Sequence, residues 1–133
     1  VLQAELDQLE TALTFVDTIL ENLKADHKTR NQCALITEEI FVNICHYAYN
    51  EKGDITLSCT ADQRERCLTL EFADKGKPFN PLEKEDPLKI TETEEKTPGG
   101  YGIYMAKQLS DHMEYHYKEG ENHLKIIKHY SVI

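Results

Sequence analysis

The chain has 133 residues, a length that suits a single domain with one hydrophobic core. Hydrophobic residues make up 40% of it and charged residues 29%, which is unlike a disordered chain, and no apolar run is long enough to cross a bilayer. The formal net charge of −9 argues against nucleic acid as the main partner, whereas a phosphate held by backbone N–H groups and a metal ion is compatible with it.

Two amphipathic helices are predicted in the N-terminal part of the sequence. In the first, expected from Glu5 to Lys24, leucine and valine recur at alternating spacings of three and four residues. This apolar stripe covers fewer heptads than a coiled coil requires, so a helix that faces the core is favoured. The second helix is expected from Lys28 to Tyr49, with three isoleucines along one face. Residues 1–4 can instead form the end of a strand.

Two β-hairpins, a long loop and a further helix are predicted after these helices. The segments ITLSCTA and CLTLEFA alternate apolar and polar residues on either side of a polar stretch, which indicates the first hairpin. The stretch from Lys75 to Thr97 has weak periodicity and is expected to be a long loop, either a functional lid or disordered. A helix is expected from Ile103 to Ser110, and MEYHYKEGENHLKIIKHY then forms a second hairpin that turns near Gly120.

The order of these elements predicts the fold class and the domain organisation. Two helices, a strand pair, a long loop, a helix and a second strand pair indicate an α+β fold, with helices packed on one face of a mixed, largely antiparallel sheet. Such a two-layer sandwich is expected to form one domain over residues 1–133. The four cysteines include no C-x-x-C pair and three of them lie in apolar patterns, which favours the reducing cytosol.

A polar stripe interrupts the second predicted helix. Glu39 and Asn43 are four residues apart and therefore lie on one face of the helix, with His46 near the same line. The oxygen of an asparagine side chain suits Mg²⁺ that also binds phosphate oxygens and water, and a nearby glutamate can accept a proton from an attacking hydroxyl. A solvated face on an ordinary helix is the alternative, because a motif this short often occurs by chance.

Two glycine-containing segments are further candidates for a ligand site. In Asp74-Lys75-Gly76, after a predicted strand, the carboxylate can accept a hydrogen bond from an exocyclic amine such as that of adenine, and the glycine lets a flat base approach. Taken alone, an ordinary turn explains this segment better. Pro98-Gly99-Gly100-Tyr101-Gly102 leads into a helix, where unusual φ values and the helix N-terminus favour an anion, although a flexible hinge would have the same composition.

The order and spacing of these three motifs resemble one family. A polar-faced helix, a strand followed by D-x-G, a long loop and G-G-x-G before a helix are similar to the GHKL (histidine-kinase-like) ATPases, which share the Bergerat ATP-binding fold. The segments EEIFVNICHYAY, DKGKPFNPL and GGYGIYMAKQLSDHMEYHYKEGENHLKIIK resemble the branch of anti-sigma-factor serine kinases (RsbW/SpoIIAB-like ATP-binding regulators). With the first helix included, the resemblance covers nearly the whole chain.

The resemblance implies a role for each matching residue. Glu39 would be the general base, and Asn43 would bind the Mg²⁺ that bridges the phosphates of ATP. Asp74 would recognise adenine, and Gly76 would lie beside the base. The other residues expected to contact the cofactor, with Lys96 near the γ-phosphate, are His46, Phe79, Lys96, Gly99, Gly100, Tyr101, Gly102 and Ile103.

The chain departs from the family pattern at three places. The G-x-T motif near the end of many GHKL proteins is absent, and Gly120-Glu121-Asn122-His123-Leu124 stands in its place. Asn80 stands where close relatives have Asp, and Tyr101 where they have Leu. These differences are compatible with ATP binding and bear on catalytic turnover.

The resemblance implies a cytoplasmic, ATP-binding serine/threonine-protein kinase of the anti-sigma factor type, with ATP and Mg²⁺ as cofactors. Its substrate would be a small anti-sigma antagonist of the STAS type, a sigma factor is a further candidate partner, and homodimers are common in the family. The alternative is a catalytically inactive, ATP-gated binding module that sequesters a sigma factor or another regulator. The catalytic domain of a histidine kinase is a third interpretation, disfavoured because the chain has no room for a phospho-accepting dimerisation hairpin.

Two clusters of side chains in the last predicted hairpin have a functional and a simpler structural explanation. His112 and His116 are four residues apart, a spacing that suits zinc on a helix. On the predicted strand this spacing is too long for easy chelation, so zinc is not favoured. Tyr115 and Tyr117 share a face of the same strand and form either an aromatic binding platform or an ordinary half-exposed face.

Overall fold

A five-stranded antiparallel sheet forms one layer of the molecule in the computed structural model, which describes residues 1–47, 53–83 and 100–133. The strand order is β1-β2-β3-β5-β4, and each of the four strand pairs is antiparallel, so the described sheet has no mixed character. The strands are β1 (Leu2–Gln3), β2 (Asp54–Asp62), β3 (Cys67–Asp74), β4 (His112–Lys118) and β5 (Glu121–His129). Both predicted hairpins are therefore present, and β1 corresponds to the strand that was the alternative for residues 1–4.

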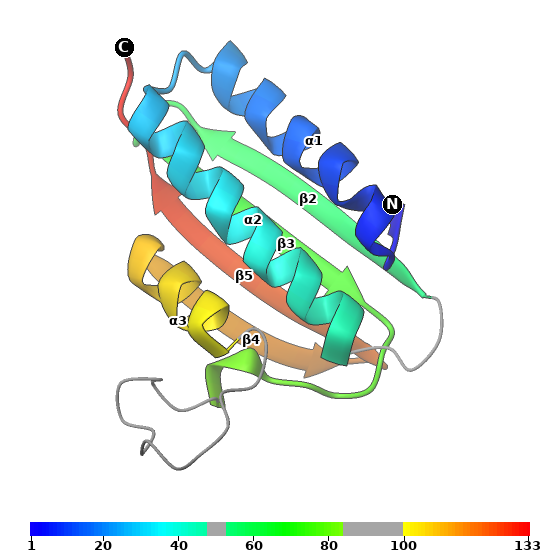
Figure 1. The fold of residues 1–133 in the computed structure, drawn as a ribbon. Coiled ribbons are helices and arrows are strands. Elements are labelled where there is room, and N and C mark those ends of the chain that lie inside the picture. The colour runs from blue at the N-terminus through cyan, green and yellow to red at the C-terminus, as the bar shows by residue number, and fades with distance from the viewer. Residues whose placement is uncertain (48–52, 84–99) are drawn as a thin grey trace.

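Among the described residues, three helices form the second layer and cover one face of the sheet (Figure 1). They are α1 (Leu9–Asn22), α2 (His27–Tyr47) and α3 (Gly100–Leu109), and two short 3₁₀ turns are η1 (Leu6–Gln8) and η2 (Pro81–Glu83). Helix α2 runs in front of β3 and β5, with α1 on one side of it and α3 on the other (Figure 1). This arrangement confirms the predicted α+β sandwich with helices on one side.

The hydrophobic core lies between α2 and the central strands. Strand β3 alternates half-buried and buried side chains along its whole length, which places Leu68, Leu70 and Phe72 on the face beneath the helices. From α2, Ile36 and Ile40 are fully buried against this face. Burial of each such side chain contributes about 1.5–3 kcal/mol, so the apolar pattern along α2 and β3 is enough to fix which faces meet.

The start of α2 is set by local hydrogen bonding. The carboxylate of Asp26, one residue before the helix, accepts the backbone N–H of Thr29 at 2.9 Å, which satisfies a donor that the first helical turn leaves without a partner. A few residues further, the guanidinium of Arg30 donates two hydrogen bonds to Asp17 of α1, at 2.8 and 2.7 Å. The two helices are therefore joined by a bidentate ion pair as well as by apolar packing.

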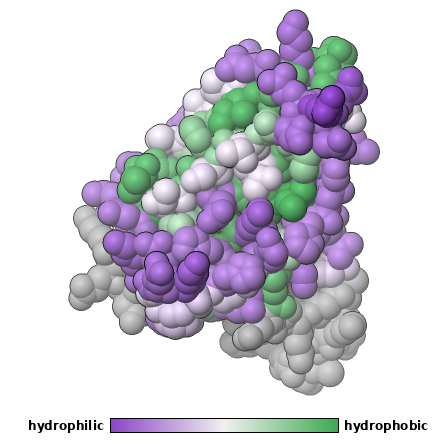
Figure 2. Space-filling view, turned by 180° about the vertical axis from the view of Figure 1, so that it is seen from behind, coloured by the Kyte–Doolittle hydropathy of each residue, from purple (hydrophilic) through white to green (hydrophobic). Residues whose placement is uncertain are grey.

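The opposite face of the sheet carries the out-pointing residues of every strand. In Figure 2, which views this face, hydrophilic and apolar residues are intermixed, and the coloured residues form no single apolar expanse. Each of the four cysteines is a free thiol. None of the described helices combines the length and the apolarity that crossing a membrane needs.

Candidate nucleotide site

The polar stripe of α2 carries one side chain that is almost fully buried. Asn43 is 3% exposed, although its neighbours on that face are isoleucines of the core. Its Nδ2 atom is buried and makes no hydrogen bond to any described residue. A buried donor without a partner costs about 1–3 kcal/mol, so this atom is available to an acceptor that a ligand would bring.

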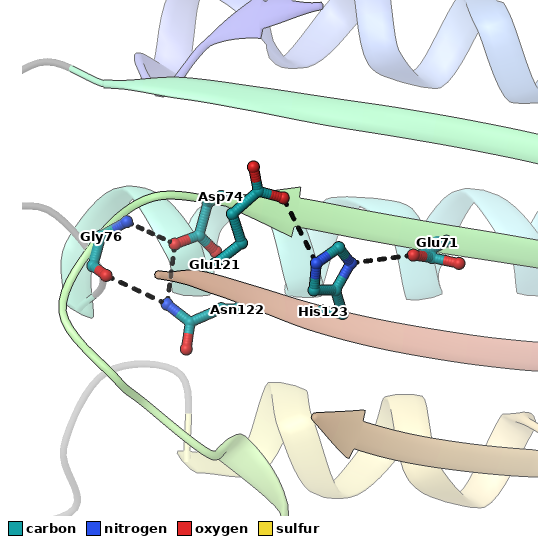
Figure 3. Close-up of polar contacts among 6 residues, drawn as sticks. All are labelled: Glu71, Asp74, Gly76, Glu121, Asn122 and His123. Atoms are coloured by element: carbon teal, nitrogen blue, oxygen red, sulfur yellow. Dashed lines mark hydrogen bonds and ion pairs between the residues drawn. The ribbon is translucent and has the colours of Figure 1, made fainter. Parts of the chain in front are cut away.

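The carboxylate of Asp74 lies at the end of β3, where the alternation of the strand turns it toward the helices. It is 4% exposed. Its Oδ1 atom accepts the backbone N–H of Gly76 at 2.9 Å and the Nδ2–H of Asn122 at 2.9 Å (Figure 3). Burial raises the pKa of the Asp74 carboxyl, and the hydrogen bonds from Asn122 and Gly76 act in the opposite direction. The Asp74 carboxylate is therefore shielded from water, and two hydrogen bonds to Oδ1 fix its orientation.

Asn43 and Asp74 line one cavity between α2 and the sheet, and Phe79 lies beside them. The cavity measures about 20 Å³, which is room for about one water molecule. A purine is larger than this, so base binding at this place requires the neighbouring side chains to move. The structure thus brings together three of the predicted site residues, from α2, from the end of β3 and from the segment after β3.

Two further residues of this cavity carry polar side chains and were not predicted as nucleotide-binding residues, Asn122 on β5 and Tyr115 on β4. The β3–β5 register pairs Asn122 directly with Asp74. A sequence pattern could have revealed Asn122, because it shares the core-facing phase of β5 with the buried Leu124 and Ile126. A polar residue in an apolar phase indicates a buried hydrogen-bonding role.

Glu39, one turn before Asn43 on α2, lies against the first turn of α3. A Cβ atom added to Gly102 would be 1.7 Å from Oε2 of Glu39, so the carboxylate fills the space beside this glycine. Burial raises the pKa of the Glu39 carboxyl, and the charge of the neighbouring Glu38 adds to the rise. Such a shift suits a group that accepts a proton near neutral pH.

The remaining predicted residues lie in different parts of the structure. Gly100 and Tyr101 begin α3, and Gly102 is helical, so at this end of the segment the glycine serves a close approach between helices and not an unusual φ. Ile103 is 2% exposed and packs in the hydrophobic core, whereas His46 is exposed. Lys96 and Gly99 lie outside the described residues.

The histidines of the last hairpin lie on the far face of the sheet. His123 contacts Glu71 at 3.0 Å and Glu121 at 3.3 Å, pointing away from the cavity (Figure 3). His112 and His116 contact the same carboxylate, that of Glu114. Over residues 1–47, 53–83 and 100–133, no three His, Cys, Asp or Glu side chains are placed to hold a metal ion.

The antiparallel sheet and the helices on one of its faces form a two-layer α+β domain, with a small polar cavity between the layers. The chain belongs to the histidine kinase-like ATPase domain family, whose model matches residues 2–128. This confirms the resemblance identified from the three sequence motifs.

One curated relative is the serine/threonine-protein kinase BtrW of Bordetella bronchiseptica, to which the chain is 25% identical over 137 aligned positions that cover 96% of each protein. Solved structures with the same fold include the blue-light activated histidine kinase of Erythrobacter litoralis EL346, with a TM-score of 0.61, 14% identity and 92% of this chain covered. Its separate histidine kinase domain gives a TM-score of 0.57 at 13% identity with 90% covered. The histidine kinase AdeS of Acinetobacter baumannii gives 0.54 at 14% with 91% covered.

The present chain spans 40%, 60% and 62% of the lengths of those three solved chains. At these identities the likeness establishes the fold alone. The match to BtrW extends over nearly the full length of both proteins, and it agrees with the serine-kinase branch named from the sequence.

Proposed function

We propose that this chain is an ATP-binding serine/threonine-protein kinase of the anti-sigma factor type, with residues 1–133 forming one ATPase domain. The observation that carries the proposal is the single cavity lined by Asn43 of α2 and Asp74 of β3, with Glu39 one helical turn away beside the start of α3. Two of these side chains come from α2 and one from β3, and their chemistry matches the nucleotide base, the metal-bound phosphates and the attacking hydroxyl of one phosphoryl-transfer site.

The base would be bound at the end of β3. Among the described residues, each hydrogen bond of the Asp74 carboxylate ends on Oδ1, so Oδ2 is the oxygen that can accept a hydrogen bond from an exocyclic amine. Gly76 is buried beside it and has no side chain to keep a flat ring away. Phe79 lines the same cavity and would pack on the base.

The residues of α2 fit a nucleotide that carries Mg²⁺. Asn43 offers a neutral side-chain oxygen to the ion, and its partnerless Nδ2–H fits a phosphate oxygen. Mg²⁺ is commonly held by few protein groups together with substrate phosphates, so one asparagine can contribute to its binding without a larger set of protein ligands. Bound with ATP, the ion would neutralise charge that develops on the transferring group.

Glu39 would accept the proton of the attacking hydroxyl. Its half-buried carboxyl has a raised pKa, which strengthens it as a base at neutral pH. The segment before α3, with Lys96 and Gly99, would close over the phosphates and exclude water. Gly100, Tyr101 and Gly102 at the start of α3 would lie beside the phosphates, and Ile103 would anchor this end of the helix in the core. His46 would lie at the outer edge of the same site. Each of these assignments is part of the proposal.

The acceptor in this proposal is a serine or threonine of a small anti-sigma antagonist protein of the STAS type, and a sigma factor is a second partner. The similarity to a serine/threonine-protein kinase along nearly the whole chain supports the choice of acceptor. The place of action would be the cytoplasm. A homodimer through the first helix or the N-terminal strand is included, since exposed apolar side chains at Leu6 and Phe15 would be covered by it.

Two measurements test the proposal. Thermal melting with and without Mg-ATP should show a higher midpoint with the nucleotide, because a ligand that binds only the folded state must stabilise it. Incubation with ATP labelled at the γ-phosphate and an antagonist protein should then give phosphoserine or phosphothreonine. An unchanged midpoint would contradict nucleotide binding itself.

Together, the thermal melting and the labelled-ATP incubation also distinguish the other candidate functions. A raised midpoint without any transferred label would support the ATP-gated binding module that sequesters a sigma factor or another regulator. An acid-labile phosphohistidine on a partner would instead support the catalytic domain of a histidine kinase. A 20 Å³ cavity that must open for the base is compatible with each of them, so the chemical identity of the product decides.

A further inference from the structure

Asn122 uses both hydrogens of its side-chain amide within the protein. Nδ2 donates to Oδ1 of Asp74 at 2.9 Å and to the backbone oxygen of Lys77 at 2.9 Å, and the backbone oxygen of Gly76 lies at 3.4 Å. The residue is 4% exposed, so water does not compete for these bonds. The amide therefore connects the Asp74 carboxylate to the chain that follows it (Figure 3).

The oxygen of the same amide is also engaged. Oδ1 accepts the backbone N–H of Phe79 at 3.1 Å and the hydroxyl of Tyr115, and that hydroxyl also lies 3.3 Å from the N–H of Phe79. The segment from Asp74 to Phe79 is thus attached at both of its ends to one side chain of β5. Tyr115 of β4 adds a second point of attachment.

The orientation of the Asn122 amide follows from this network. Nδ2 faces three oxygen acceptors, and Oδ1 faces two donors, so exchanging the two atoms would oppose acceptor to acceptor and donor to donor. A carboxylate of the same shape cannot replace the amide, because it would place an oxygen against the oxygens of Asp74, Gly76 and Lys77. The position requires a group with a donor at one end and an acceptor at the other.

We propose that Asn122 is a positioning residue that sets base specificity: it holds Oδ1 of Asp74 so that Oδ2 alone meets the ligand, and the site selects a purine with a 6-amino group over one with a 6-oxo group. This inference rests on the proposed function, in which Asp74 contacts the base. Asn122 itself touches no ligand, since its polar atoms are occupied by protein partners. It acts by preventing the carboxylate from rotating toward other donors.

The test compares ATP with inosine triphosphate, which differs from ATP by an oxygen in place of the 6-amino group. In the wild-type protein, calorimetry should give an affinity at least about tenfold higher for ATP, because the 6-oxo purine leaves the carboxylate without its hydrogen bond. In Asn122→Ala the ratio of the two affinities should fall toward one. In Asn122→Asp, ATP binding at pH 8 should be weaker than in Asn122→Ala, because the added oxygen repels Asp74.

Two further variants separate positioning from folding. Tyr115→Phe removes one donor to Asn122 and keeps the ring, so the ratio of affinities should lie between those of the wild type and Asn122→Ala. Asn31→Asp makes the same chemical change on the exposed surface of α2 and should leave the ratio unchanged. Thermal melting of each nucleotide-free variant reports whether it is folded, and a folded variant with a lower ratio cannot be explained by lost stability.

The outcomes distinguish this inference from the function on which it rests. If the wild type prefers ATP and both Asn122→Ala and Tyr115→Phe keep the full preference, the positioning role is wrong and the nucleotide site stands. If the wild type binds ATP and inosine triphosphate equally, base specificity is absent and the inference is wrong. If neither nucleotide binds the wild type, the proposed function fails and this inference fails with it.

Discussion

The carboxylate of Glu39 occupies the position that a side chain on residue 102 would need. A Cβ atom on Gly102 would lie 1.7 Å from Oε2 and 2.6 Å from Cδ of Glu39, distances that real side chains do not adopt. Helices α2 and α3 therefore approach each other closely at the proposed general base. The glycine leaves room here for the Glu39 carboxylate between the two helices and does not serve an unusual φ, because Gly102 lies within α3.

Gly102→Ala should impair phosphoryl transfer without unfolding the protein. The clashing atoms are the far end of a flexible, half-buried side chain, which can rotate away, and alanine favours a helix over glycine by about 1 kcal/mol. The thermal midpoint should therefore stay near that of the wild type. Transfer of label from ATP should fall by about 10²-fold, the lower end of what a positioned general base contributes.

A double-mutant cycle is the control for this prediction. Glu39→Gln removes the base and keeps its shape, so Gly102→Ala should cause little further loss when Glu39→Gln is already present. Labelled transfer in the wild type, the two single variants and the double variant gives the coupling between the positions. Fully additive losses would mean that Gly102 acts on the reaction by another route.

Asn43→Ala should abolish the stabilisation by Mg-ATP and change the free protein little. In the free protein, lost packing and the removal of a buried donor without a partner have opposite signs, so the free energy of unfolding should change by less than about 1 kcal/mol. At a ligand concentration of 100 times Kd, Mg-ATP should raise the free energy of unfolding of the wild type by about 2.7 kcal/mol. Thermal melting checks both values, and Asn31→Ala, at an exposed position of the same helix, should keep the full gain.

The secondary structure, and the contribution of Asn43 and Asp74 to the cavity, could be predicted from periodicity. The alternation along CLTLEFA predicts β3, and with it the inward direction of Asp74, while the four-residue spacing of Glu39 and Asn43 predicts a shared face of α2. Periodicity does not give the order of strands, because that order depends on pairing between segments far apart in the sequence. The position of β5 between β3 and β4, which brings Asn122 to Asp74, had to come from the structure.

Contacts between side chains could not be predicted from the sequence either, because they also depend on how distant segments pack. The segment around Asn122 is recognisable from sequence only as the place where G-x-T is missing, whereas the structure shows an amide with four firm hydrogen bonds. The glycine at position 102 was expected to provide unusual φ values, and its close approach to Glu39 depends on how α2 and α3 pack. Local patterns specify elements, and the packing between elements decides which polar groups meet.

Asp74→Asn should stabilise the free protein at pH 7 and weaken ATP binding. Burial raises the pKa of this carboxyl, with Glu121 adding to the rise and His123 opposing it from β5. A raised pKa means that Asp74 contributes stability below its unfolded pKa, near 3.8, and that this contribution is lost as the pH rises through the folded pKa. The variant's advantage in free energy of unfolding should therefore be largest near pH 7 and shrink toward pH 4.

Urea unfolding of the wild type and of Asp74→Asn across this pH range gives the stability difference. ATP affinity, measured by calorimetry, should be at least about tenfold weaker in the variant, because the amide replaces a charged acceptor. In the wild type, affinity should decrease on acidification before the pH reaches the usual aspartate range, since the raised pKa protonates Asp74 early. A pH-independent affinity in the wild type would contradict base recognition by this carboxylate.

Asp17→Asn should lower stability modestly by breaking the ion pair between α1 and α2. The hydrogen bond from Arg30 is the main cause of the lowered pKa of Asp17, but the Asp17 side chain is 43% exposed, so solvent screens the pair. The expected loss in free energy of unfolding is about 0.5 kcal/mol at pH 7.

The pH dependence of this loss follows from the pKa of Asp17. Because the folded pKa is depressed below 3.8, the stabilisation by the ion pair is present above the unfolded pKa and is lost as the pH falls through the folded value. Urea unfolding at pH 7 and below pH 3.8 should therefore show the free energies of unfolding of the wild type and Asp17→Asn converging at the lower pH. Arg30→Lys keeps the positive charge but not the bidentate geometry, so its free energy of unfolding at pH 7 should lie between those of the wild type and Asp17→Asn. A gap that stays constant with pH would assign the loss to packing between the helices and not to the charge of Asp17.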